Sequence, residues 1–252
     1  MAVLAERGRG FRVRDVTVPI VPQAILFDLL NGGDKAWGRK PPFFDLGAAA
    51  CEAAASSFAL GTAGAGYGAT TATLKGGLGS ASTVTPSGFT VGAIVAVNAV
   101  GSSLMGDGPH FWAAPYEQNA EFGGLGWPYA LPRNALDTRL KGGPGQSTTI
   151  ALVATDALLT KASAKRIATA AHDGLSRALR PAHTPLDGDI VFAAGTGLRP
   201  VADAMALNEI AVAAADVLAR AIARGVFEAR ALPFPGALPA WKDRFGRIMV
   251  SP

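Results

Sequence analysis

A run of hydroxyl-bearing residues stands where a glycine-rich loop meets an apolar stretch. The junction reads Gly142-Gly-Pro-Gly-Gln-Ser147-Thr148-Thr149, and we predict a strand directly after it. One interpretation is chemical: the Thr148 hydroxyl attacks the preceding carbonyl group, the peptide bond shifts to an ester, and water releases a new amino terminus. The freed α-amine, with a pKa of about 8, then acts as a base for its own hydroxyl. The alternative is an ordinary strand start with polar turn residues, which composition alone favours.

Other residues that could act in catalysis or ligand binding do not have the spacing of a known motif. Gly64-Ala-Gly-Tyr-Gly68 lacks the preceding strand and following helix of a dinucleotide loop, and glycine rather than Ser or Thr follows Lys75. The chain has no Gly-x-Ser-x-Gly elbow of the serine hydrolases. His110, His172 and His183 are far apart in sequence and show no metal-type spacing. We therefore predict no metal and no cofactor.

The elements that would position the junction follow from hydropathy and from the placement of glycine and proline. In the first part of the chain we expect an extended segment over 16–30, a helix over 43–60, a packed glycine loop over 61–82, a strand over 89–100 and an irregular loop over 101–147. Two strand-then-helix units should follow: strands over 149–155 and 189–194, each before a helix, over 163–179 and 201–224. Residues 227–252 should form a surface tail. This order predicts an α/β domain with a covered sheet.

Composition narrows the functional classes. The 252 residues are 49% hydrophobic, enough for a single domain with a substantial core. The net charge of +4 is spread along the chain without a basic stripe, so we expect no nucleic-acid partner. The longest uncharged stretch, 76–106, contains too many polar and glycine residues for a membrane span. A single cysteine, Cys51, excludes a disulfide scaffold and favours a cytoplasmic location.

The loop over 101–141 is rich in aromatic residues. These side chains could line a binding cleft or pack beneath one, and the pattern does not choose between the two. They are Phe111, Trp112, Tyr116, Phe122, Trp127 and Tyr129.

Several short motifs, taken together and in order, resemble one known family. They are Val18-Pro-Ile-Val-Pro22, Asn31-Gly-Gly-Asp-Lys-Ala-Trp-Gly38, Gly61-Thr-Ala-Gly-Ala-Gly-Tyr-Gly68, Lys75-Gly-Gly-Leu-Gly-Ser-Ala81, Ala96-Val-Asn98, Ala154-Thr-Asp-Ala157 and Asp187-Gly-Asp189. The chain is similar over nearly its whole length to the β-peptidyl aminopeptidases, which include the L-aminopeptidase/D-esterases and the nylon-oligomer endo-hydrolases. The resemblance implies a four-layer αββα sandwich of the N-terminal-nucleophile type that cleaves itself, here into 1–147 and 148–252.

The resemblance also implies roles for individual residues. Thr148 matches the nucleophile that autocleavage after Ser147 would expose. Asn98 matches an oxyanion-hole asparagine, although it could simply cap a strand end. Lys75 matches a lysine that would favour a neutral Thr148 amine, although a lysine at a loop tip is usually solvated. Asp187 and Asp189 match the acidic pair, or the serine and acid pair, that the family has near the nucleophile. Two carboxylates there would orient the α-ammonium or the lysine, and a polar turn before a strand is the alternative.

The implied activity is that of a self-processing aminopeptidase or amidohydrolase. It would hydrolyse short peptides or amides with a free amino terminus through an acyl ester on Thr148. We rank acyl transfer to an amine, as in the fold-related ornithine acetyltransferases, lower because their motifs differ. The family leads us to expect a homo-oligomer, a tetramer of processed protomers, whose only other partner is a small peptide or amide substrate.

Three departures from the family motivate a second hypothesis. The chain is expected to lack the amino-terminal region of the family, and therefore the first strands of one sheet. Ser147 replaces the usual Asn or Gly before the nucleophile, and Phe27 replaces a tyrosine, which removes a hydroxyl donor. The alternative function is accordingly a truncated, non-catalytic relative that keeps the fold and the oligomer surface but not the activity.

Overall fold

The computed structural model describes residues 1–142 and 147–250. They form two compact units. The first comprises Met1–Ile25 and Gly33–Phe58, and the second comprises Leu26–Gly32 and the chain from Ala59 onward. Every residue that we predicted to do chemistry lies in the second unit. The predicted loop residues 143–146 lie outside the described residues.

The first unit is small. It contains helix α1 (Ala2–Glu6), an antiparallel hairpin of β1 (Phe11–Val13) and β2 (Val16–Val18), and helix α2 (Phe43–Glu52). The expected extended segment over 16–30 contributes only the short strand β2. The helix predicted over 43–60 ends at Glu52, and residues 53–60 are not helical.

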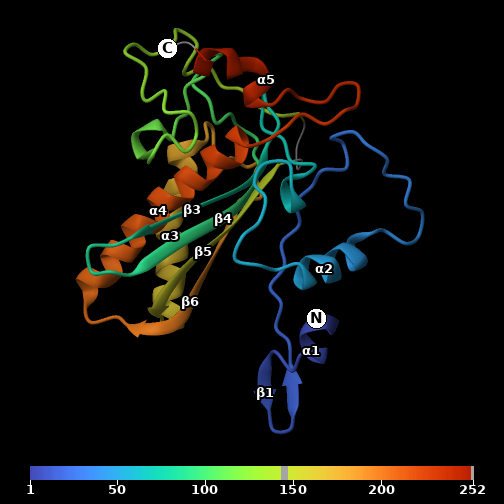
Figure 1. The fold of residues 1–252 in the computed structure, drawn as a ribbon, viewed down its shortest axis with the longest axis vertical. Coiled ribbons are helices and arrows are strands. Elements are labelled where there is room, and N and C mark those ends of the chain that lie inside the picture. Colours follow the sequence, from blue (N-terminus) through green and yellow to red (C-terminus); the bar gives the residue numbers. More distant parts are fainter. Residues whose placement is uncertain (143–146, 251–252) are drawn as a thin grey trace. The chain divides into compact units, whose positions relative to one another are not determined.

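The second unit is built on a four-stranded sheet (Figure 1). The strands are β3 (Gly77–Val84), β4 (Thr90–Asn98), β5 (Thr148–Leu158) and β6 (Ile190–Pro200), in that order across the sheet. The first three are antiparallel neighbours, whereas β5 and β6 run parallel. The three predicted strands are confirmed, with β5 and β6 longer than expected.

Strand β3 corrects the prediction of a glycine loop over 61–82. A Cβ atom on Gly79 would lie 1.8 Å from the Ala221 carbonyl oxygen, and one on Gly77 would lie 2.1 Å from the Gly225 carbonyl oxygen. Both carbonyl groups belong to the helix α4 described next. These glycines therefore allow a strand to approach a helix backbone closely, a use of glycine that composition does not distinguish from flexibility.

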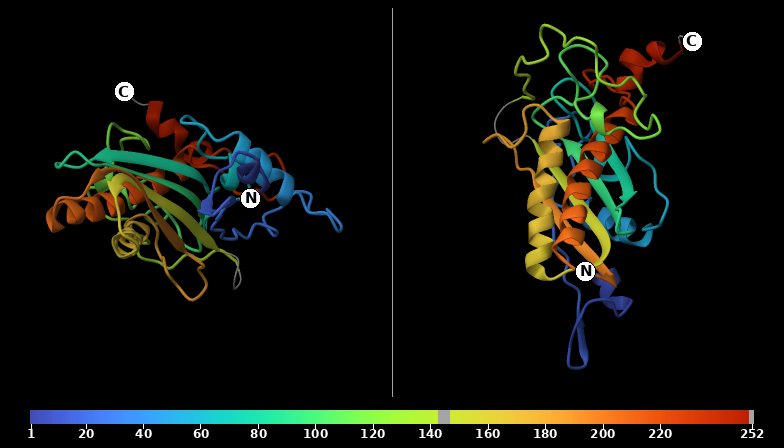
Figure 2. Two further views of the ribbon diagram at one scale, coloured as in Figure 1. Left: turned by 90° about the horizontal axis from the view of Figure 1, so that it is seen from below. Right: turned by 90° about the vertical axis from the view of Figure 1, so that its left-hand side faces the viewer.

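Two long helices lie side by side against the sheet (Figures 1 and 2). Helix α3 (Lys161–Ala178) connects β5 to its parallel neighbour β6, as predicted for a strand-helix-strand unit, and α4 (Ala204–Phe227) follows β6. Each helix starts at a capping side chain: Thr160 accepts a hydrogen bond from the Ser163 N–H, and Asp203 from the Ala206 N–H.

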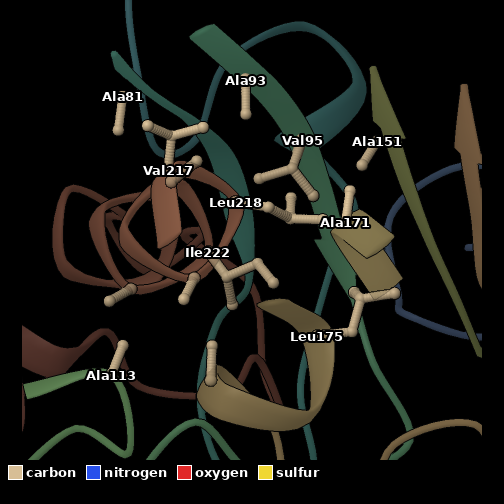
Figure 3. Packing of buried hydrophobic residues seen from close by; sticks show 14 of the residues in the cluster. Ala81, Ala93, Val95, Ala113, Ala151, Ala171, Leu175, Val217, Leu218 and Ile222 are labelled. Carbon is tan, nitrogen blue, oxygen red and sulfur yellow. The ribbon is translucent and has the colours of Figure 1, made fainter. Parts of the chain in front are cut away.

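The core lies between these helices and the sheet. Figure 3 shows Ala93 and Val95 of β4 packed near Leu218 and Ile222 of α4 and Leu175 of α3. Burial alternates along β5, and Leu152 on the opposite face of this strand is 38% exposed. Within the described residues the helices α3 and α4 thus cover one face of the sheet. The strands β3 to β6 and the helices α3 and α4 thus form one sheet layer and one helix layer.

The C-terminal segment is not the surface tail that we predicted. Trp241, at the start of helix α5 (Trp241–Phe245), is fully buried. Its ring stacks on Phe111 at 5.9 Å between centroids, and its Nε1 donates to the Pro109 carbonyl oxygen at 2.9 Å. The proline-rich stretch around Trp241 has no hydrophobic periodicity that would predict its burial. Trp241 is buried because it packs against the distant loop that contains Pro109 and Phe111.

The loop over 101–141 is irregular as predicted, with only the 3₁₀ turn η2 (Ala114–Tyr116) among its described residues. A second 3₁₀ turn, η1 (Gly64–Gly66), precedes β3, and η3 (Gly246–Val250) follows α5. Phe111 and Phe122 join the core, whereas Trp127 is half exposed. No helix among the described residues is both long and apolar enough to cross a membrane.

Candidate active site

One end of the sheet gathers the predicted site residues. Strand β4 ends at Asn98 and the antiparallel β5 begins at Thr148, so these two residues are register partners. Because β6 starts beside the start of the parallel β5, the turn before it lies next to Ser147, and Ser147 and Asp187 form a parallel bridge. Topology thus explains how residues about 50 and 40 positions from Thr148 meet it.

The Thr148 hydroxyl is hydrogen-bonded to the carbonyl group of the preceding residue, Ser147. Its Oγ1 donates to the Ser147 carbonyl oxygen at 2.6 Å, and the Gly188 N–H donates to the same oxygen at 3.0 Å. A Cβ atom at position 188 would lie 2.8 Å from Thr148 Oγ1, so glycine leaves room for the hydroxyl. The Thr148 hydroxyl and the Gly188 N–H thus both contact the Ser147 carbonyl oxygen, so the candidate nucleophile adjoins the carbonyl group that an acyl shift would use.

Asp187 and Asp189 bind main-chain groups around Thr148. Asp189, whose side chain is almost fully buried, accepts from the Thr149 N–H at 2.8 Å, and Asp187 accepts from the Val100 N–H at 3.2 Å. Burial, and then the nearby Asp189 carboxylate, raise the pKa of Asp187. The two carboxylates hold β4, β5 and the start of β6 together. Orientation of a Thr148 ammonium by this pair stays a prediction.

Two histidines form a cluster that their separation in sequence concealed. His183 Nδ1 lies 3.4 Å from Asp189 Oδ2, and its Nε2 lies 3.4 Å from His172 Nδ1. Burial, and then His183, lower the pKa of His172. We predicted isolated structural or exposed histidines. The cluster exists because α3 and the turn before β6 are adjacent in the fold.

Asn98 is fully buried at the end of β4. Among its contacts, Oδ1 accepts from the Thr70 N–H at 3.1 Å and from the Lys141 ammonium at 2.5 Å. Its Nδ2 donates to the Phe27 carbonyl oxygen at 2.9 Å. The carboxamide is therefore an integral part of the site, and Phe27 contributes its main chain there.

Lys75 is not the solvated loop lysine of the alternative interpretation. It is 2% exposed, and its ammonium donates to the carbonyl oxygens of Gly66, Ala69 and Gly76 at 2.7, 2.7 and 2.9 Å. Burial, then Lys141, lower the pKa of Lys75 to about 8. No hydrogen bond among the described residues links its ammonium to Thr148, so its predicted effect on the Thr148 amine stays a prediction.

Lys141 is a site residue that the sequence pattern did not indicate. It is 8% exposed, and burial lowers the pKa of its ammonium to about 8, against the opposing effects of Asp187 and Asp28. It stands in an aperiodic loop, so no spacing rule could place it beside Asn98. Gly188 was also missed, because only the carboxylates of the Asp-Gly-Asp motif suggested chemistry.

Lys75 and Lys141 both line a cavity of about 300 Å³. Its wall includes Asn31, Thr70 and the loop over 232–238. Because Lys141 and Thr70 also contact Asn98 Oδ1, the cavity adjoins the carboxamide. None of the six aromatic residues of the 101–141 loop lies in this wall. The volume suits a small organic group rather than a macromolecule.

Comparison with known proteins agrees with this architecture. Residues 2–237 match the family model of peptidase family S58, and the chain belongs to that family. An uncharacterised aminopeptidase of Mycobacterium tuberculosis is 40% identical over 268 residues, which cover 97% of this chain and 73% of the relative.

Two solved structures share the fold. A β-aminopeptidase from a Burkholderia species has a TM-score of 0.55 at 24% identity, over 82% of this chain and 59% of its own. The L-aminopeptidase D-Ala-esterase/amidase of Ochrobactrum anthropi, described as a variant of the Ntn-hydrolase fold, has a TM-score of 0.50 at 22% identity, over 77% of this chain and 55% of its own. The expected fold class and family resemblance are thereby confirmed.

Proposed function

We propose that this chain is a self-processing aminopeptidase whose nucleophile is Thr148. One observation carries the proposal: the Thr148 hydroxyl and the Gly188 N–H converge on the Ser147 carbonyl group. Membership of peptidase family S58 and the aminopeptidase name of the mycobacterial relative support it.

Self-processing would proceed by an acyl shift. Thr148 Oγ1 bonds to the Ser147 carbonyl carbon, and the Gly188 N–H stabilises the negative charge that develops on the oxygen. The bond from that carbon to the Thr148 nitrogen then breaks, and the hydroxyl proton passes to this nitrogen. Water hydrolyses the resulting ester, which leaves a Ser147 carboxylate and a free Thr148 amine.

Peptide hydrolysis would reuse the same groups. The Thr148 amine takes the hydroxyl proton as Oγ1 attacks the substrate carbonyl carbon, and the proton then passes to the leaving amine. The candidate donors to the developing oxyanion are the Gly188 N–H, which already contacts the Ser147 carbonyl oxygen, and the carboxamide of Asn98, the register partner of Thr148. Water hydrolyses the acyl ester and restores the threonine. The reaction needs no cofactor.

We propose short peptides or amides with a free amino terminus as substrates. The cavity of about 300 Å³ beside Asn98 accommodates one residue side chain or a small leaving group. Assembly as a homo-oligomer of processed protomers is part of the same proposal and rests on the family alone.

The test is the intact mass of the purified chain. Wild type should give fragments 1–147 and 148–252, and Thr148→Ala should stay whole. Thr149→Val is the matched control: Thr149 is fully buried, its hydroxyl has no partner among the described residues, and valine has the same shape. This variant should be cleaved like wild type.

Activity is then measured on aminoacyl and β-aminoacyl anilides and on dipeptides. Turnover that requires both cleavage and Thr148 supports the proposal. A whole wild-type chain without turnover would instead support the non-catalytic relative, for which Ser147 and Phe27 are the motivating residues. A whole Thr148→Ala chain that keeps full activity would exclude Thr148 as the nucleophile.

A further inference from the structure

Lys141 is buried beside Asn98, and both its main chain and its side-chain ammonium make hydrogen bonds there. Its main-chain N–H donates to the Val100 carbonyl oxygen at 2.8 Å. Its ammonium donates to Asn98 Oδ1 at 2.5 Å and to the Thr70 carbonyl oxygen at 3.4 Å. Because Val100 follows β4 by two residues, the lysine is anchored to the same strand end as its target side chain.

An ammonium group can only donate hydrogen bonds, and this limits the orientation of the amide that it contacts. Oδ1 of Asn98 faces two donors, the Lys141 ammonium and the Thr70 N–H. An inverted carboxamide would place its NH₂ group against both of them, which leaves two buried donor-to-donor contacts. The Lys141 ammonium therefore acts together with the Thr70 N–H and the Phe27 carbonyl oxygen, which accepts from Nδ2, to hold the carboxamide in this orientation.

The charge also affects the strength of that donor. A cation on the oxygen of an amide draws electron density from its nitrogen, so the N–H groups become better donors. Lys75 does not duplicate this effect, because its ammonium is bound to three main-chain carbonyl oxygens. The two buried lysines in one cavity wall thus have different tasks.

We propose that Lys141 is a positioning residue, which acts on the reaction by fixing and polarising the Asn98 carboxamide. The effect on catalysis rests on the proposed function, in which Asn98 Nδ2 stabilises the oxyanion. The orientation of the Asn98 side chain does not rest on it.

The kinetic test compares Lys141→Met with Lys141→Arg. Methionine keeps most of the length of the side chain but not the donor, and kcat should fall by up to about 100-fold with KM little changed. Arginine is also a pure donor, has the adjoining cavity for its extra volume, and should restore most of kcat. Lys165→Met, which removes an exposed lysine of α3, is the matched control and should behave as wild type. A folded Lys141→Met variant with wild-type kcat would overturn the proposal.

The second test needs no activity. The chain has five asparagines, so ¹⁵N-asparagine labelling gives few side-chain amide signals, and the Asn98 pair is assigned by its loss in an Asn98 variant. Thr148→Ala is the common background, which keeps the chain whole. The Asn98 signals should move with pH around 8, and Lys141→Met should abolish this movement whereas Lys75→Met should not.

The two tests separate the possible failures. If wild type is neither cleaved nor active, the proposed function fails, and the Asn98 signals still decide whether Lys141 positions the amide. If the Asn98 signals are the same with and without the Lys141 ammonium, the positioning role is refuted, whatever the activity.

Discussion

Asn98 and Thr148 lie opposite each other where β4 ends and β5 begins. The backbone ladder itself therefore sets the separation between the candidate oxyanion donor and the candidate nucleophile. Such a pair is rigid, because each residue is fixed by inter-strand hydrogen bonds rather than by a loop. A site on strand ends also explains why the N–H of Gly188, in the turn before β6, reaches the Ser147 carbonyl group next to Thr148.

Asn98→Asp should separate folding from catalysis. The carboxylate has the size of the carboxamide and still accepts from Lys141 and Thr70, so the chain should fold. Its second oxygen replaces the Nδ2 donor against the Phe27 carbonyl oxygen, so the thermal unfolding midpoint should fall. It has no N–H to give to an oxyanion, and kcat should fall by about 100- to 1,000-fold. Steady-state kinetics and the thermal unfolding midpoint measure the two effects. Wild-type kcat in this variant would remove Asn98 from the mechanism.

Gly188→Ala should slow self-processing. The added Cβ would lie 2.8 Å from Thr148 Oγ1, so the hydroxyl must move away from the Ser147 carbonyl group. We expect a loss of at least about tenfold in the cleavage rate, followed by intact mass against time. Gly92→Ala in β4 is the control, because its nearest new contacts would be an ordinary 3.7 Å. Equal cleavage rates in the two variants would contradict the geometry described.

The two buried lysines should make stability depend on pH. Each has its pKa lowered from 10.5 to about 8 in the folded chain, so between these values the unfolded chain binds more protons. The free energy of unfolding therefore rises with pH over this window, by up to about 1.4 kcal/mol per pH unit for each lysine.

Urea unfolding of Thr148→Ala at pH 8.0 and pH 9.5 measures this rise, with the chain kept whole. Adding Lys141→Met should reduce the rise, because one of the two titrating groups is then absent. If the rise in the free energy of unfolding were unchanged, the pKa of Lys141 would not be lowered in the folded chain.

Glu121→Ala should destabilise the fold. Glu121 links the loop over 101–141 to helix α4. Its carboxylate accepts two hydrogen bonds from the Arg220 guanidinium, at 2.5 and 3.1 Å. The Arg220 and Glu121 side chains are 6% and 12% exposed, so removal of the carboxylate strands a buried cation, at a cost of about 3–5 kcal/mol.

Glu228→Ala is the control for that measurement. Its ion pair with Lys242 is far more exposed, at 36% and 46% for the two side chains, and its loss should cost less than about 1 kcal/mol. Chemical denaturation of both variants gives the comparison. Equal losses would show that burial does not govern the Glu121 contact.

Local patterns were sufficient to predict the strands β4, β5 and β6, the helices α3 and α4, and the change from loop to strand at Ser147–Thr148. The alternation of apolar and polar residues in a strand, and their helical periodicity in a helix, arise because one side of the element is buried. Both patterns are visible in the sequence of the element itself. The order of short motifs then indicated the family. It also picked out Asn98, Lys75, Asp187 and Asp189, all of which meet at one end of the sheet or in the adjoining cavity wall.

Contacts between distant segments were beyond these patterns. Gly77 and Gly79 looked like loop residues because nothing near them in sequence reveals the α4 backbone that excludes a Cβ atom. Lys141 stands in an aperiodic loop, and Gly188 acts through a main-chain N–H that every residue type but proline has. Such groups acquire their roles only when strand pairing and loop closure bring a partner to them, and tertiary structure alone decides which partner that is.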